Sequence, residues 1–152
     1  MITIKLGELK SIIEGLNEIA GEKLPVKVSW AFNKVAKKIV KEYQTFEETR
    51  MKLAMSLCEK DDKGVVVTEK KPDESGKLVD QFKFSDEKRT QFNKEFNELC
   101  NIDLELNAYP VKLSQFGDDV SATPTTLMKL EKLIIDDAEP KVEGKPELKI
   151  VN

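Results

Sequence analysis

The sequence predicts a mainly α fold of the α+β class: a long antiparallel helical pair, a β-hairpin at its tip, and a small base of short strands and two terminal helices. The longest helical pattern, over residues 25–60, provides one arm of the pair. A cap signal at Ser85 starts the other arm, and the stretch between the arms has the composition of a hairpin. The length favours a single globular domain over residues 1–136, followed by a charged C-terminal tail over residues 137–152.

Two elements are expected before the long helix. Ile2 and Ile4 alternate with polar residues, which predicts a short strand. A helix follows, because apolar residues recur at spacings of three and four as far as Gly21, a residue type common just past helix ends. The apolar positions of this helix are Leu9, Ile12, Ile13, Leu16 and Ile19.

The long helix is expected to begin at Pro25, where the missing proline N–H group costs nothing. Its apolar residues recur at spacings of three, four and seven, which places them on one helix face. They are Phe32, Val35, Ile39, Tyr43, Phe46, Leu53 and Leu57. A helix of roughly 35 residues extends about 50 Å. Turn-forming residues at 61–64 predict its end near Lys60.

A hairpin and a second long helix are expected next. The β-branched residues 65–68 predict one strand and residues 77–84 its partner, with a polar loop between them. Ser85 is a good N-cap, and the two acidic residues that follow it interact favourably with the positive end of the helix dipole. The apolar face of this helix carries Phe92, Phe96, Leu99 and Cys100.

The remaining elements belong to the base. Residues 102–106 alternate between apolar and polar side chains, which predicts a half-buried strand, and residues 111–113 predict another extended segment. Thr123 followed by Pro124 is a strong helix start. The buried face of this last helix is expected to carry Leu127, Leu130 and Ile134.

The composition argues against an enzyme. Histidine is absent, which removes the commonest general base and the commonest metal ligand. The scattered glycines form no phosphate-binding loop, and the acidic doublets have no calcium-loop spacing. Two cysteines, Cys58 and Cys100, lie on apolar helical stretches and are expected to be free thiols. The sequence therefore predicts no catalytic residues, no metal site and no cofactor.

The ends and apolar runs of the chain bear on its location. The first residues do not resemble the apolar region of a secretory signal. No apolar run approaches the ~20 residues of a membrane-spanning helix. These observations favour a protein without membrane contact.

A lysine stripe is the main candidate for partner binding. Six lysines and no acidic residue occur from Lys23 to Lys41, although the formal net charge of the chain is −3. Such a stripe can contact phosphates or an acidic protein surface, and Trp30 beside it is a typical interface residue. An acidic chain with only two arginines argues against nucleic acid, because arginine is the usual phosphate reader. The candidate partner-binding residues are Trp30, Lys34, Lys37, Lys38 and Lys41, and the alternative is a solvated helix face.

The order of several segments resembles a known group of proteins. Leu-Pro-Val-Lys-Val-Ser at residues 24–29 leads into the lysine helix, and Phe-Glu-Glu-Thr-Arg at residues 46–50 follows. Residues 92–99 then run into the alternating strand, and Pro-Val-Lys-Leu at residues 110–113 precedes the last helix. Residues 1–136 are in this respect similar to small phage-encoded proteins of unknown function from phages of Gram-positive bacteria. The resemblance implies a viral origin and a non-enzymatic role.

Three functions remain open at this point. The first is a virion structural or assembly component that acts by protein–protein interaction, through an acidic protein partner or through self-association as a homo-oligomer. The second is a phage-encoded inhibitor that binds a host or defence protein. The third, which the charge balance disfavours, is a nucleic-acid-binding regulator that uses the lysine stripe. The expected location is the host cytoplasm or the virion.

Overall fold

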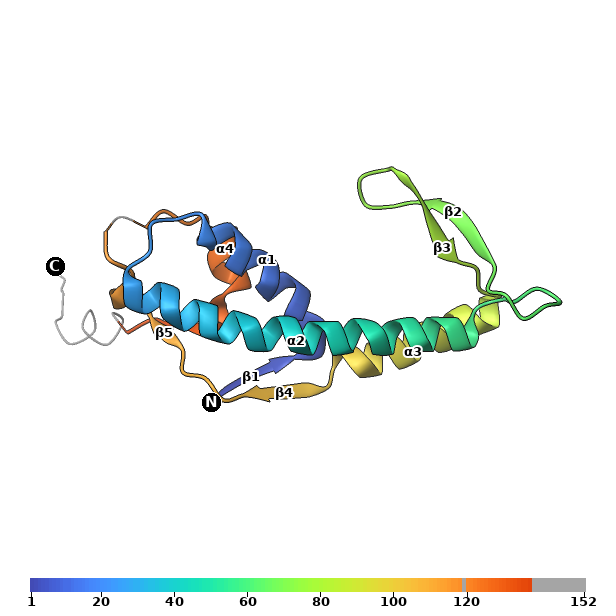
Figure 1. The fold of residues 1–152 in the computed structure, drawn as a ribbon, viewed down its shortest axis with the longest axis horizontal. Helices are drawn as coiled ribbons and strands as arrows, with labels where there is room; N and C mark the ends of the chain where they lie inside the picture. Colours follow the sequence, from blue (N-terminus) through green and yellow to red (C-terminus); the bar gives the residue numbers. More distant parts are fainter. Residues whose placement is uncertain (119, 138–152) are drawn as a thin grey trace, which may run out of the picture. The chain divides into compact units, whose positions relative to one another are not determined.

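The computed structural model describes residues 1–118 and 120–137, and Figure 1 shows the order of their helices and strands. The chain combines helices and strands, with one long helix and small two-stranded sheets, which confirms the coarse prediction. It divides into two compact units. Unit 1 contains residues 1–43 and the described residues from 103 onward, and unit 2 contains residues 44–102. The finer predicted arrangement and the predicted single domain stay predictions.

A short antiparallel sheet joins the two segments of unit 1. Strand β1 (Ile2–Lys5) pairs with β4 (Asp103–Leu106), with Ile2 opposite Leu106 and Ile4 opposite Leu104. Ile2, Ile4 and Leu106 are buried, while the residues that alternate with them are exposed, as expected for a sheet with one face in the core. Both predicted strands are thus present.

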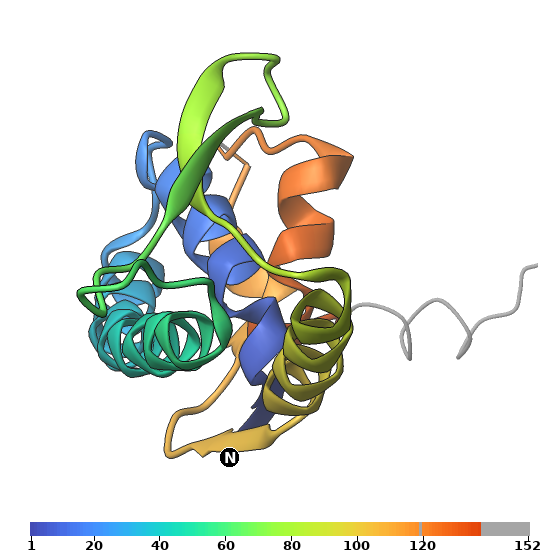
Figure 2. The same cartoon turned by 90° about the vertical axis from the view of Figure 1, so that its right-hand side faces the viewer.

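The first helix follows a single 3₁₀ turn and lies in the middle of unit 1. Helix α1 (Leu9–Ala20) buries four of the five apolar residues of its predicted stripe, Ile13 being only half-buried, and Figure 2 shows the helix between α4 and the beginning of α2. Gly21 is the C-cap, but its φ of −76° is right-handed, so the backbone there does not require glycine. The buried residues of the stripe are Leu9, Ile12, Leu16 and Ile19.

The long helix α2 (Val26–Leu57) is confirmed, although it ends three residues before the predicted position at Lys60. The reason lies in backbone pairing: the Glu59 amide donates to the Lys83 carbonyl, and the Glu59 carbonyl accepts from the Val67 amide. These bonds hold the chain extended where the helix was expected to continue. Val28, Phe32, Val35, Ile39, Phe46 and Leu57 are among the buried residues of α2.

The hairpin of unit 2 lies later in the sequence than predicted. Strands β2 (Thr68–Pro72) and β3 (Leu78–Phe82) pair in antiparallel fashion. Of the strand predicted at residues 65–68, only Thr68 belongs to β2, while Val66 forms an isolated antiparallel bridge with Lys60. The Asp61 carboxylate accepts hydrogen bonds from the backbone amides of Lys63 and Val65, which holds the start of the β-branched run in a turn. The turn between the strands contains Gly76, whose φ of +85° favours glycine.

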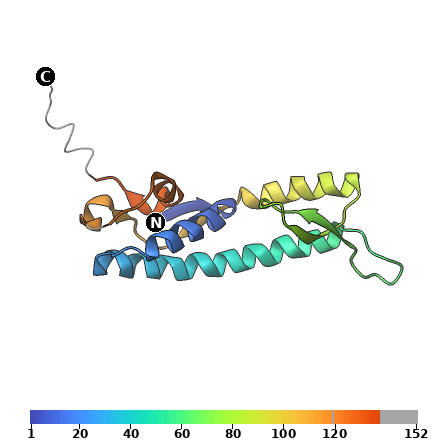
Figure 3. The same ribbon diagram turned by 90° about the horizontal axis from the view of Figure 1, so that it is seen from above.

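Helix α3 (Asp86–Cys100) begins as predicted, because the Ser85 side chain accepts a hydrogen bond from the Lys88 amide. Figure 3 shows α3 beside the second half of α2. The ring of Phe96 lies 5.9 Å from that of Phe46 on α2 and 5.7 Å from that of Phe92, measured between centroids. The Phe46–Phe96 pair thus connects the two helices, and Phe92 stacks on Phe96 within α3.

The last helix of unit 1, α4 (Pro124–Lys129), is shorter than expected. Thr123 caps it and Pro124 occupies its first turn, as predicted. Ile134 does not lie on the helix, however, because β6 (Ile134–Ile135) pairs in parallel with β5 (Val111–Lys112). The helix stops at Lys129, and Leu130 and Leu133 then enter the core with exposures of 0% and 1%. The predicted tail lies outside the described residues except for Asp137, whose carboxylate accepts from the backbone and hydroxyl of Ser114.

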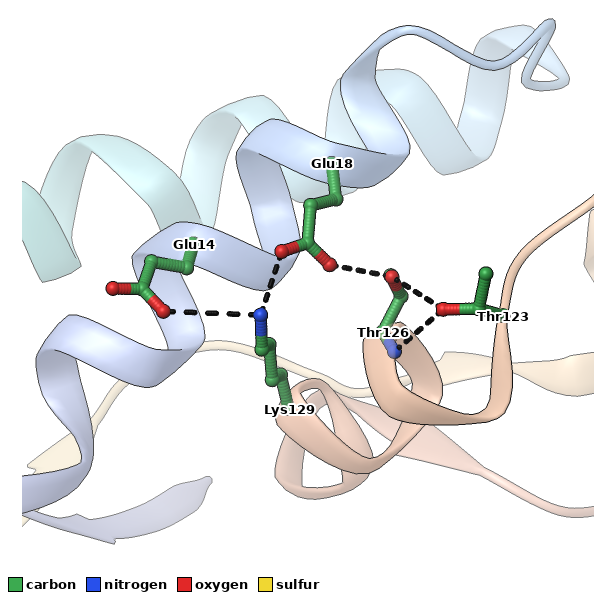
Figure 4. Close-up of polar contacts among 5 residues, drawn as sticks. All are labelled: Glu14, Glu18, Thr123, Thr126 and Lys129. Carbon is green, nitrogen blue, oxygen red and sulfur yellow. Dashed lines mark hydrogen bonds and ion pairs between the residues drawn. The ribbon is translucent and has the colours of Figure 1, made fainter. Parts of the chain in front are cut away.

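A polar cluster links α1 to α4 (Figure 4). Glu18 accepts a hydrogen bond of 2.5 Å from the Thr126 hydroxyl and one of 2.6 Å from the Lys129 ammonium group. Thr126 is itself buried, so its hydroxyl needs this partner. The Lys129 bond, followed by the Thr126 bond, lowers the pKa of Glu18 below its ordinary value of 4.5.

This lowered pKa predicts acid sensitivity. A carboxylate whose pKa is lower in the folded state stabilises the fold above its unfolded pKa, and that stability is lost as the pH falls through the folded pKa. The loss should therefore begin near pH 4.5 and continue below it. We expect Glu18→Gln to lower the thermal midpoint at neutral pH and to flatten the fall of the midpoint in acid. Glu14→Gln is the matched control, because Glu14 lies 3.8 Å from Lys129 and should have a smaller effect. Identical pH profiles for wild type and Glu18→Gln would contradict the expectation.

Candidate protein-binding groove

The first half of α2 leaves large side chains exposed on one face. The side chain of Trp30 is 63% exposed and that of Val26 is 84% exposed, although both belong to an otherwise amphipathic helix. Val26, Trp30, Lys34 and Lys38 follow one another at intervals of four residues, so they share a face. The face on the opposite side of the helix carries buried Val28, Phe32 and Ile39 and fixes the orientation of α2 within unit 1.

The connection between β4 and β5 forms the second wall of a groove. This connection, residues 107–110, presents Tyr109, which is 85% exposed. The Lys38 ammonium group donates a hydrogen bond of 2.5 Å to the Asn107 carbonyl and so ties this connection to α2. The groove between the two walls has a volume of about 710 Å³. Its lining comprises Val26, Lys27, Trp30, Ala31, Lys34, Val35 and Lys38 from α2, and Asn107, Ala108, Tyr109, Pro110, Val111 and Gln115 from the other wall.

Trp30 and Lys34 interact directly. The Lys34 nitrogen lies 4.8 Å from the centre of the Trp30 ring, which is a cation–π distance. Residues four apart on a helix are neighbours, so this contact follows from the sequence spacing. The contact restricts both side chains and keeps a positive charge at the edge of an exposed aromatic surface.

The groove contains some of the predicted binding residues but not all of them. Trp30, Lys34 and Lys38 line it, whereas Lys37 and Lys41 lie outside its lining. The helical geometry explains the difference: Lys37 lies about 100° around α2 from Lys38, whereas Lys41 lies on the same side as Lys34 but about two turns farther along the helix. The groove therefore contains three of the five predicted residues.

Lys27 and Tyr109, a charged and an aromatic residue of the groove, were not among the residues predicted from the sequence. Lys27 lies seven residues before Lys34 and thus on the same helix side, so its spacing could have identified it. Tyr109 could not be found in this way, because it belongs to a connection that only the tertiary fold brings to α2. Its position before Pro110 and outside any apolar period was the only available signal.

The charge of the groove differs from that of the whole chain. Lys27, Lys34 and Lys38 contribute positive charges, and no aspartate or glutamate belongs to the lining. In sequence, no acidic residue occurs at 23–41 or at 106–117, the segments that form the two walls. The groove is therefore basic in a chain of net charge −3.

The cysteines and acidic residues bear on whether the chain has other kinds of site. Among residues 1–118 and 120–137, no group of three or more metal-binding side chains is close enough to hold an ion. Cys58 and Cys100 are free thiols. Burial raises the pKa of the Cys100 thiol, which disfavours the reactive thiolate. Within the same described residues, no helix combines the length and apolar character needed to cross a membrane.

Comparison of the chain with known protein families, with curated proteins and with solved structures found no match. The resemblance to phage proteins accordingly stays a prediction. A functional assignment rests on the groove and its side chains.

Proposed function

We propose that this protein acts by binding another protein through the groove, without catalysing a reaction. The observation that carries the proposal is Trp30, a large side chain that remains 63% exposed on the wall of a groove. Tryptophan is strongly enriched among the residues that dominate protein interfaces, especially beside a pocket. Tyr109 on the facing wall adds a second aromatic side chain of the type enriched at interfaces.

We further propose that the binding serves virus assembly, as a structural or assembly component of a phage particle. The order of sequence segments that resembles small phage proteins supports this part of the proposal. In it, the long helical pair with its hairpin serves as a scaffold arm, and the groove supplies the contact with a neighbour. Self-association is one form that such a contact can take.

A site-specific cross-linker tests the proposed function. A photoreactive phenylalanine derivative in place of Trp30 is expected to form a covalent bond with a particle protein during infection. The same derivative in place of Lys37, which is exposed on α2 but outside the groove lining, serves as the matched control. Mass spectrometry then identifies the cross-linked partner and shows whether the chain is present in purified particles.

The outcomes distinguish the two protein-binding functions. A cross-link from position 30 to a particle protein, absent at position 37, would support the assembly role. Absence from particles together with a position-30 cross-link to a host protein would overturn that role and favour a phage-encoded inhibitor. Equal or no cross-linking at the two positions would overturn binding through the groove.

A further inference from the structure

We infer that the groove binds a short acidic peptide segment that carries a bulky apolar side chain. The inference rests on the proposed function and specifies the chemistry of its partner. The groove volume of about 710 Å³ falls within the ~300–1,000 Å³ typical of pockets that enclose small ligands, so the groove has room for a few side chains of a peptide segment.

Charge complementarity identifies the acidic part of the segment. Three lysines line the groove, and both walls belong to stretches without an acidic residue. The nearest acidic residues beyond these stretches are Glu22 and Glu42 on one side and Glu105 and Asp118 on the other, and none of them belongs to the lining. A carboxylate entering the groove thus meets positive charges without a competing carboxylate among the lining residues.

The exposed rings identify the apolar part. Trp30 and Tyr109 stand on opposite walls, and Val26 adds a third exposed apolar surface at the start of α2. Covering these surfaces removes apolar area from water, which stabilises a complex. A leucine or phenylalanine side chain between acidic residues would cover the rings while its neighbours approach the lysines.

The positions of the lysines favour a peptide over a nucleic-acid strand. Lys38 donates to the Asn107 carbonyl and Lys34 lies on the Trp30 ring, so both are held close to the groove and do not extend along a phosphate backbone. The lining contains no arginine, the residue best suited to grip phosphate with two parallel hydrogen bonds. A nucleic-acid strand remains the competing occupant, and the experiment below includes one as a probe.

Trp30 provides a direct measurement, because it is the only tryptophan of the chain. The probe is a short peptide of phenylalanine flanked by glutamate and glycine, which contributes no tryptophan fluorescence. Its matched control has glutamine in place of every glutamate, and an oligothymidylate with the same number of charges represents a nucleic-acid strand. Titration of the full chain with each probe gives the change in Trp30 emission and the dissociation constant.

We expect the acidic peptide to bind about tenfold more tightly than its glutamine counterpart, and this advantage should shrink as salt is added. Lys34→Glu should weaken acidic-peptide binding about tenfold, whereas Lys37→Glu makes the same charge change outside the lining and should weaken it about twofold or less. Circular dichroism of both variants checks that each retains the fold.

Several results would overturn the inference. Equal affinity for the acidic and glutamine peptides, equal effects of the two lysine variants, or tighter binding of the oligothymidylate would each do so. Unchanged Trp30 emission at the highest soluble concentration of the peptide would also overturn the inference. These failures leave the proposed function intact if position 30 still cross-links to a protein, so the two claims fail separately.

Discussion

Replacing Leu130 with alanine is expected to lower the free energy of unfolding of unit 1 by about 2–5 kcal/mol. Leu130 is 0% exposed and enters the core directly after α4. The substitution loses the transfer free energy of the removed methyl groups. It also leaves a cavity, because the close contact between Leu130 and α1 at Gly15 limits how far the surrounding side chains can move in to fill the space. Urea unfolding followed by circular dichroism and by Trp30 fluorescence would measure the loss, since Trp30 belongs to unit 1.

Leu127→Ala is the matched control for this change. Leu127 lies one turn earlier and is 36% exposed, so the same chemical change should cost less there. Equal losses for the two leucines, or a loss below 1 kcal/mol for Leu130→Ala, would contradict the packing described for the end of α4.

Replacing Gly15 with valine is expected to destabilise unit 1 by about 1–3 kcal/mol through overpacking. A Cβ atom at this position would lie 2.8 Å from the Lys129 Cβ and 3.0 Å from two side-chain carbons of Leu130. The Lys129 Cβ is fixed to the backbone and cannot move away as a flexible chain end would. Helix α1 and the end of α4 would therefore have to separate. The same unfolding measurement applies.

Gly21→Val supplies the control for the glycine substitution. A Cβ at Gly21 would meet only the Glu18 carbonyl, at 3.9 Å, and its backbone is right-handed. The effect should stay within about 0.5 kcal/mol. The double variant Gly15→Ala, Leu130→Ala should lose less stability than the sum of the losses of the two single variants. The alanine at position 130 leaves room for the Cβ atom that the substitution adds at position 15. Strict additivity would argue against direct contact between the two positions.

The helix starts were the most predictable parts of the fold. Ser85 and Thr123 were identified correctly because a cap is a local interaction between a side chain and an amide three residues later. The apolar stripe of α1 and the existence of a long helix α2 followed from the period of apolar residues, although α2 ends three residues before its predicted end at Lys60. The significance of Gly15 was missed, since helix propensity predicts only a local cost and not the approach of Lys129 and Leu130.

Long-range pairings set the limit of prediction. The parallel pair of β5 and β6 has two residues in each strand, too few to establish a period. Ile134 was therefore assigned to a helix that ends five residues earlier, at Lys129. The groove shows the same division: the helical wall containing Trp30 and Lys34 was predictable, whereas Tyr109 depends on tertiary packing.

The division of the chain also bears on the order in which the two units can fold. Unit 2 is one continuous stretch, residues 44–102, whereas unit 1 requires segments from both sides of it. The pairing of Ile2 with Leu106 closes a loop that contains the whole of unit 2. Loop closure costs more entropy as the loop grows, but a compact insert brings its own ends nearer. On the ribosome, the continuous unit has all of its chain available first, and the core around Leu130 forms only after the rest has emerged.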